Sequence, residues 1–75
     1  MQLSHNEKYR QLGLNIAYYR KRSGISQSKL AEKVNVSRTH MSRIETAECA
    51  VSLDVLFSIC EVLEISPEKL FTFRD

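Results

Sequence analysis

The residues best suited to chemistry lie in one segment, QSKLAEKVNVSRTHMSRIE, which runs from Gln27 to Glu45. Its second half is rich in short polar and basic side chains, namely Ser37, Arg38, Thr39, His40, Ser42 and Arg43. In the major groove of DNA, arginine pairs with guanine edges, and threonine meets a base edge or the thymine methyl group. A helix with such residues on its outer face suits that groove, so this segment indicates DNA binding.

The spacing of apolar residues in this segment predicts two short helices joined by a tight turn. These residues are Leu30, Ala31, Val34, Val36, Met41 and Ile44. Met41 and Ile44 are three apart, share one face and should pack inward, which leaves the polar residues outside. Ser26 and Ser37 can cap the two helices. Asn35 at the bend tolerates a left-handed backbone better than most residues.

This segment resembles the helix-turn-helix of the Cro/phage-repressor (XRE-like) family of DNA-binding domains. The resemblance covers residues 12–71, through the stretches IAYYRKRSGISQSKLAEKVNVSRTHMSRIE, SLDVLFSICEVLEIS and SPEKLF. It implies an all-α fold of five helices, a lambda-repressor-like domain with its helix-turn-helix at helices two and three. The family usually has glycine where this chain has Asn35. It also has glycine and often proline after the glutamate, where this chain has TAECAV.

Seventy-five residues predict a single helix-turn-helix domain over residues 1–75. We expect helices at about 6–23, 27–34, 38–45 and 53–63, the last of these capped by Ser52, and a short one that Ser66 caps and Pro67 begins. Three apolar stripes should face inward on the first, fourth and fifth helices: Leu12, Ile16 and Tyr19; Leu53, Leu56, Ile59, Cys60 and Leu63; Leu70 and Phe71.

The charges are distributed unevenly, although the net charge is only +2. Residues 8–43 carry nine lysines and arginines against Glu32 alone, whereas residues 44–75 carry two basic residues against seven acids. The basic block coincides with the helix-turn-helix, so one side of the domain can face phosphates. The chain has no apolar run long enough to span a membrane, and its N-terminus lacks the apolar segment of a signal peptide, which predicts a cytoplasmic protein.

The resemblance also implies roles for individual residues on double-stranded DNA. Base edges would be reached by Arg38, Thr39, Ser42 and Arg43. Phosphates would be contacted by Ser26, Gln27, Ser37, His40 and Lys33. Gln27 matches the family's backbone-contacting glutamine, and it starts a helix whose free amides and dipole favour a phosphate. Simpler alternatives remain: the arginines could touch phosphates only, the helix-starting residues could be caps, and His40 or Lys33 could be plain solvated surface.

A structural ion pair is expected between Arg20 and Glu45, since these positions form a salt bridge in similar domains. Each residue ends a helix, and a bridge between them would fix the angle at which the reading helix is presented. Arginine is favoured by the dipole at such an end, whereas glutamate there needs a compensating cation. The alternative is two independent surface charges.

A second surface is expected on the fourth helix and beyond the fifth. Val55 and Val62 are seven residues apart and off the main apolar stripe, Phe57 flanks them, and Phe73 follows the last helix. Apolar residues beyond what a small core absorbs indicate a partner-facing patch, and the alternative is an extension of the core. The simplest partner is a second copy of the chain, because a two-fold dimer reads a palindrome.

No pattern typical of an enzyme is present. The chain lacks a plausible Ser/His/Asp arrangement, metal-ligand spacing and, with two glycines, a phosphate-cradling loop. We therefore expect no catalysis, cofactor, metal or small-molecule ligand. Cys49 in an exposed loop and Cys60 in the core are expected to be free thiols.

The favoured function is a sequence-specific transcriptional regulator, a homodimer on a palindromic operator. It would be of the phage-repressor or restriction–modification controller type, since RTHMS is similar to the RTYIS of such controllers. The alternative is an antitoxin-type protein-interaction module, in which the acidic surface of helices four and five carries the function and DNA binding is secondary.

Overall fold

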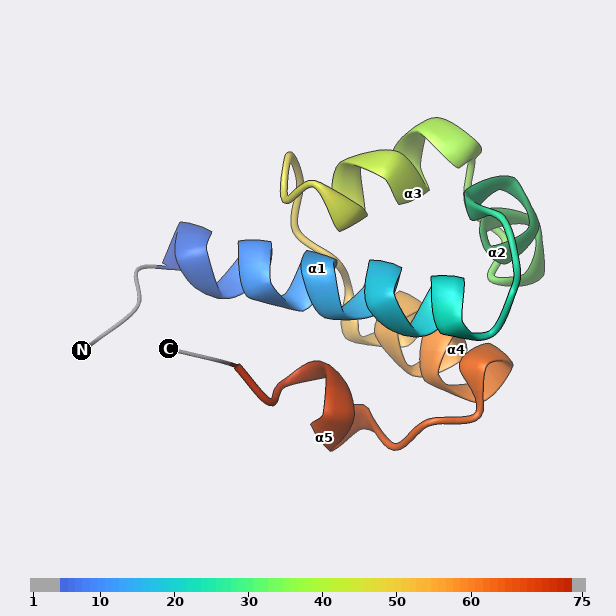
Figure 1. The fold of residues 1–75 in the computed structure, drawn as a ribbon. Helices are drawn as coiled ribbons and strands as arrows, with labels where there is room; N and C mark the ends of the chain where they lie inside the picture. Colours follow the sequence, from blue (N-terminus) through green and yellow to red (C-terminus); the bar gives the residue numbers. More distant parts are fainter. Residues whose placement is uncertain (1–4, 74–75) are drawn as a thin grey trace.

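Five helices account for the architecture of residues 5–73, the part of the chain that the computed structural model describes. They are α1 (His5–Arg22), α2 (Gln27–Lys33), α3 (Arg38–Glu45), α4 (Leu53–Leu63) and α5 (Pro67–Leu70). Helix α1 runs across the molecule with α3 along one side and α4 and α5 along the other, while α2 contacts both α3 and α4 (Figure 1). No strand occurs in the described range, which confirms the predicted all-α fold of five helices. None of these helices is long and apolar enough to cross a membrane.

Three of the four expected serine caps are made. Ser26, Ser37 and Ser52 each accept a hydrogen bond from the backbone amide three residues later, at 3.0–3.2 Å. The prediction for Ser66 was wrong, because its side chain makes no capping bond. Helix α5 is a single turn, and the amide of Lys69 donates to the carbonyl oxygen of Ser66 at 3.1 Å instead of to its hydroxyl.

Helices α1 to α4 all end in the same backbone geometry. A left-handed residue lies at or just after each C-cap: Gly24 (φ 76°), Asn35 (63°), Ala47 (63°) and Glu64 (56°), which is itself the C-cap of α4. In each case the next amide bonds the carbonyl oxygen five residues earlier at 2.8–3.4 Å, which defines a Schellman motif. The left-handed backbone predicted at Asn35 is confirmed. Ala47 and Glu64 were not anticipated, and left-handed geometry costs about 1–2 kcal/mol at residues that carry a Cβ.

The core is built from the predicted apolar stripes of all five helices. Its buried members are Leu12, Ile16, Leu30, Ala31, Val34, Met41, Ile44, Leu56, Ile59, Cys60, Leu63 and Leu70. Ala31 is buried on α2, the helix that packs against α3. Cys49 packs against this core half-buried, so the expectation of an exposed loop cysteine was wrong. Burial raises the pKa of the Cys60 thiol.

Two residues assigned to the core are on the surface. Leu53 is 62% exposed and Phe71 is 48% exposed. Leu53 shares a face with Leu56 but begins α4, in a first turn that the neighbouring helices do not cover. Phe71 follows Leu70 by one residue, about 100° around the helix, so a single turn that buries Leu70 turns Phe71 outward.

Candidate nucleic-acid interface

The outer face of α3 carries the predicted base-contacting residues. Arg38, Thr39 and Arg43 are exposed and Ser42 is half-buried, while Met41 and Ile44 on the opposite face are buried. The structure brings all four together along one polar pocket of about 230 Å³, which Gln27 and Glu48 also line. The side chains of Arg38, Thr39 and Arg43 make no hydrogen bond or ion pair to any residue of the described range. They are therefore available to an external ligand.

The tilt of α3 is fixed by the ion pair predicted between Arg20 and Glu45, which the structure contains. The guanidinium of Arg20 donates from Nε to Glu45 Oε2 at 2.7 Å and from Nη2 to Oε1 at 3.1 Å. Both side chains are nearly buried, at 11% and 5% exposure. A bidentate arginine–carboxylate pair fixes direction as well as distance. It therefore ties the end of α1 to the end of α3.

Two further contacts extend this pair and were not predicted. Nη1 of Arg20 donates to the carbonyl oxygen of Ile25 at 3.0 Å, and Nε2 of Gln27 donates to Glu45 Oε1 at 3.0 Å. Gln27 begins α2, so the carboxylate of Glu45 joins the ends of α1 and α3 to the start of α2. Three donated hydrogen bonds satisfy this buried carboxylate, as a charge removed from water requires.

A glycine on α1 sets the distance between α1 and α3. A Cβ at Gly13 would collide with the backbone carbonyl oxygens of Ile44 and Glu45, the latter contact being the closer of the two. No side chain fits there, because backbone atoms cannot swing aside as a flexible side chain can. This role was not predicted, since a glycine inside a helical segment indicates only a weak helix former.

The predicted phosphate contacts are only partly brought together. Ser26, Ser37 and His40 are exposed, near the N-termini of α2 and α3. Gln27 commits one amide N–H to Glu45 and keeps its second N–H and its oxygen for other partners. Lys33 is exposed but lies apart, lining a different pocket with Ser23, Ile25, Val62, Leu63 and Glu64. Lys33 comes six residues after Gln27 on α2, so the two side chains point about 120° apart around the helix axis.

Glu48 lies on the same pocket as the four base-contacting candidates and was missed. The sequence places it in the TAECAV loop, where nothing in its neighbours marks it as part of the α3 surface. The Schellman motif at the end of α3 brings it there, because its amide donates to the carbonyl oxygen of Arg43 at 2.8 Å. An acid thus lies within an otherwise basic and polar face.

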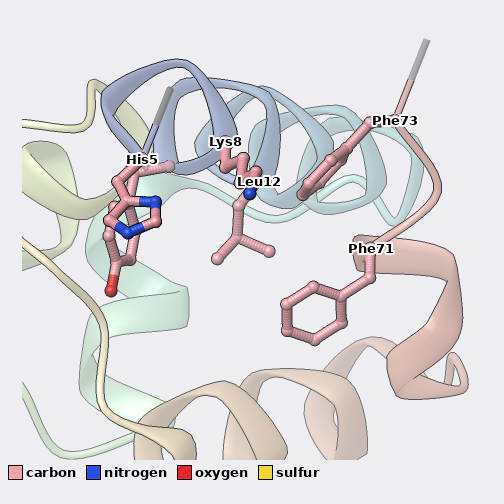
Figure 2. A pocket seen from close by; sticks show the side chains of 6 residues that line it. His5, Lys8, Leu12, Phe71 and Phe73 are labelled. Atoms are coloured by element: carbon pink, nitrogen blue, oxygen red, sulfur yellow. The ribbon is translucent and has the colours of Figure 1, made fainter. Parts of the chain in front are cut away.

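A third pocket lies between the start of α1 and the segment after α5. Figure 2 shows Leu12, Phe71 and Phe73 around it, with His5 and Lys8 on the α1 side. Its volume is about 330 Å³ and Tyr9 completes its lining. The rings of Phe71 and Phe73 have centroids 6.4 Å apart.

Comparisons with known proteins point to one family. The helix-turn-helix family model matches residues 16–70. The HTH-type transcriptional regulator SinR of Bacillus licheniformis is 35% identical over 65 residues, 85% of this chain and 59% of that protein, so this chain spans well under two thirds of its length. The Control protein C.BamHI of Bacillus amyloliquefaciens is 34% identical over 73 residues, which cover 97% of this chain and 83% of that protein.

Solved structures share the fold over most of the chain. The restriction-modification controller protein C.AhdI from Aeromonas hydrophila superposes with a TM-score of 0.83 at 26% identity, covering 87% of this chain and 98% of that one. The clp gene regulator ClgR from C. glutamicum gives a TM-score of 0.78 at 29% identity, covering 83% of this chain and 80% of that one.

Proposed function

We propose that this chain, which belongs to the helix-turn-helix family, is a transcriptional regulator that binds a specific operator sequence in double-stranded DNA in the cytoplasm. One observation carries the proposal. Helix α3 presents Arg38, Thr39 and Arg43 outward with no side-chain partner among residues 5–73, while its other face is buried and its end is held by the Arg20–Glu45 pair. A rigid helix with free donors on one face is what reading a major groove requires.

In this proposal the side chains of α3 read base edges and the flanking helix ends hold the backbone. Arg38 and Arg43 pair with guanine, and Thr39 and Ser42 meet neighbouring bases. Phosphates bind at the N-termini of α2 and α3, where Ser26, Ser37 and the second N–H of Gln27 lie, with His40 beside them. Lys33 lies off this face and adds only long-range attraction.

We further propose that the regulator is a homodimer on a palindromic operator. Three large apolar side chains support a dimer surface: Leu53 and Phe57, one turn apart on α4, and Phe71 after α5, each about half exposed or more. Val55, Val62 and Phe73, the candidates from the sequence, are half-buried and pack against the core. Each therefore exposes only part of its side chain to a partner.

The relatives make a controller or repressor role the favoured form of regulation. The Control protein C.BamHI matches nearly the whole chain, and C.AhdI, a restriction-modification controller, is matched over nearly its whole length. We propose that this chain acts in the same way on its own operator.

Selection from a randomised duplex pool tests DNA reading directly. We expect enrichment of one palindromic motif, and Arg43→Ala should relax the preference at particular base pairs by about 1–3 kcal/mol. Lys33→Ala is the matched control: it removes one charge away from the face and should weaken all sequences alike. A pool that stays random would contradict operator recognition and favour a protein-interaction module.

The dimer is tested separately by sedimentation equilibrium. Phe57→Glu should yield a monomer that binds a single half-site but loses its advantage on the full palindrome. Leu14→Glu is the matched control, because Leu14 is a similarly exposed apolar residue on α1. A Phe57→Glu protein that sediments as a dimer would place the interface elsewhere.

A further inference from the structure

We propose that Glu48 is a specificity-determining residue that accepts a hydrogen bond from the exocyclic amino group of a cytosine in each half-site. This inference rests on the proposed operator binding and assigns one further base preference to the same face. Glu48 lines the polar pocket together with Arg38, Thr39, Ser42 and Arg43, and it is the one acid among those residues.

The backbone holds Glu48 in a fixed place relative to α3. It follows the left-handed Ala47 in the Schellman motif, and its amide donates to the carbonyl oxygen of Arg43 at 2.8 Å. The side chain is oriented as well, because the hydroxyl of Thr46 donates to Oε2 of Glu48 at 2.8 Å. A side chain oriented before binding loses less entropy when it meets its partner.

The carboxylate keeps most of its accepting capacity. The single hydroxyl hydrogen of Thr46 is shared between Glu48 and the carbonyl oxygen of Ser42, which lies 2.9 Å from Oγ1. An ionised carboxylate has about four lone-pair positions, so most of them are unfilled within the described chain. Water fills them in the free protein, and docking on DNA removes much of that water.

The chemistry of base edges determines what can replace the water. Phosphates repel a carboxylate. Guanine and thymine present the acceptors O6 and O4 in the major groove, so neither base can donate a hydrogen bond to the carboxylate there. Adenine offers its N6 amino group but places the N7 acceptor next to it. Cytosine offers its N4 amino group with no acceptor beside it on that edge, so it is the best match. Glu48 thereby both selects cytosine and penalises guanine and thymine.

The test is selection from a randomised duplex pool with the full chain, three new variants and the Arg43→Ala variant of the operator test. We expect the wild type to prefer a C·G pair at one position of each half-site, at least about tenfold over the other pairs, as one good base contact allows. Glu48→Ala should lose this preference alone. Glu48→Gln should move it to adenine, since an amide can bond N6 and N7 together. Glu61→Ala, which removes one exposed acid from α4, should leave every preference unchanged.

The outcomes separate this inference from the proposed function. If Glu48→Ala binds every duplex more tightly by one common factor and keeps all preferences, the acid only repels phosphates and the cytosine assignment is wrong. If the wild type enriches no motif at all, operator recognition itself fails. A motif that Arg43→Ala alters and Glu48→Ala does not would overturn only the role of Glu48.

Discussion

The ion pair between Arg20 and Glu45 allows the sharpest prediction about stability. Both side chains are almost buried, and the carboxylate accepts three hydrogen bonds. In Glu45→Ala the guanidinium keeps only its bond to the carbonyl oxygen of Ile25. Breaking a buried pair on one side leaves an uncompensated charge, so we expect the free energy of unfolding to fall by about 3–5 kcal/mol.

That loss is large for a domain of this size. At about 0.05–0.15 kcal/mol per residue, 75 residues give a total stability of roughly 4–11 kcal/mol. With about 4–8 °C per kcal/mol for a small domain, the melting temperature should fall on the order of 12–40 °C. Thermal and urea unfolding followed by circular dichroism measure both quantities. Operator affinity, measured at a temperature where the variant is folded, should also fall because α3 loses its fixed tilt.

A matched control removes a different acid. Glu32→Ala breaks the pair between Lys29 and Glu32, whose side chains are 53% and 73% exposed. Such a pair is screened by water and contributes little, so the melting temperature should hardly move. The reasoning is refuted if Glu45→Ala melts within about 3 °C of the wild type, which corresponds to less than 1 kcal/mol.

Four further predictions follow from particular residues. Gly13→Ala should destabilise the fold by about 1–3 kcal/mol or more, measured by urea unfolding, because its Cβ meets backbone atoms of α3. Ala47→Gly should raise the free energy of unfolding by about 0.5–1 kcal/mol, since relief of the left-handed strain exceeds the added entropy of the unfolded chain. A thiol reagent should modify Cys49 before Cys60, because burial raises the pKa of Cys60 and keeps its thiol protonated; equal rates would contradict this. The logarithm of DNA affinity should fall with the logarithm of salt concentration at a slope of about −5 to −9 for 6–10 phosphates, and a slope near zero would exclude this binding mode.

Helix positions and the face of α3 were predictable because each depends on neighbours in the sequence. The three-residue spacing of Met41 and Ile44 determines which side of α3 is buried, and therefore which side carries Arg38 and Arg43. The caps at Ser26, Ser37 and Ser52 are equally local. Predictions of this kind needed no knowledge of how the helices pack.

Predictions about burial failed where they depended on what covers a side chain. Leu53 and Phe71 have the residue types of a core, but each lies at an end of its helix, where exposure is decided by neighbouring helices. Val55 and Val62 lie off the main stripe and were assigned to a partner surface, with an extension of the core as the alternative. The structure packs them half-buried against the core, so the partner surface stays a prediction. A periodic pattern predicts the direction in which a side chain points, but not how far neighbouring helices bury it.

The ion pair between Arg20 and Glu45 was predicted from the resemblance to the family and could not be predicted from apolar periodicity. Nothing local links Arg20 to Glu45, 25 residues further on, yet family likeness identified the pair, and the structure contains it. Resemblance to the family predicts nothing about positions where this chain departs from the family pattern. The family usually has glycine after the glutamate, and this chain adopts the left-handed geometry there with Ala47. The turn is therefore retained at a cost in backbone strain.

The retained turn determines where Glu48 lies. Its backbone amide is held against the carbonyl oxygen of Arg43, and its side chain lines the same pocket as the outer face of α3. Strain at Ala47 and an acid on the proposed DNA-facing surface thus have one origin, the loop TAECAV. We expect operator preference to differ between this chain and its relatives at this loop.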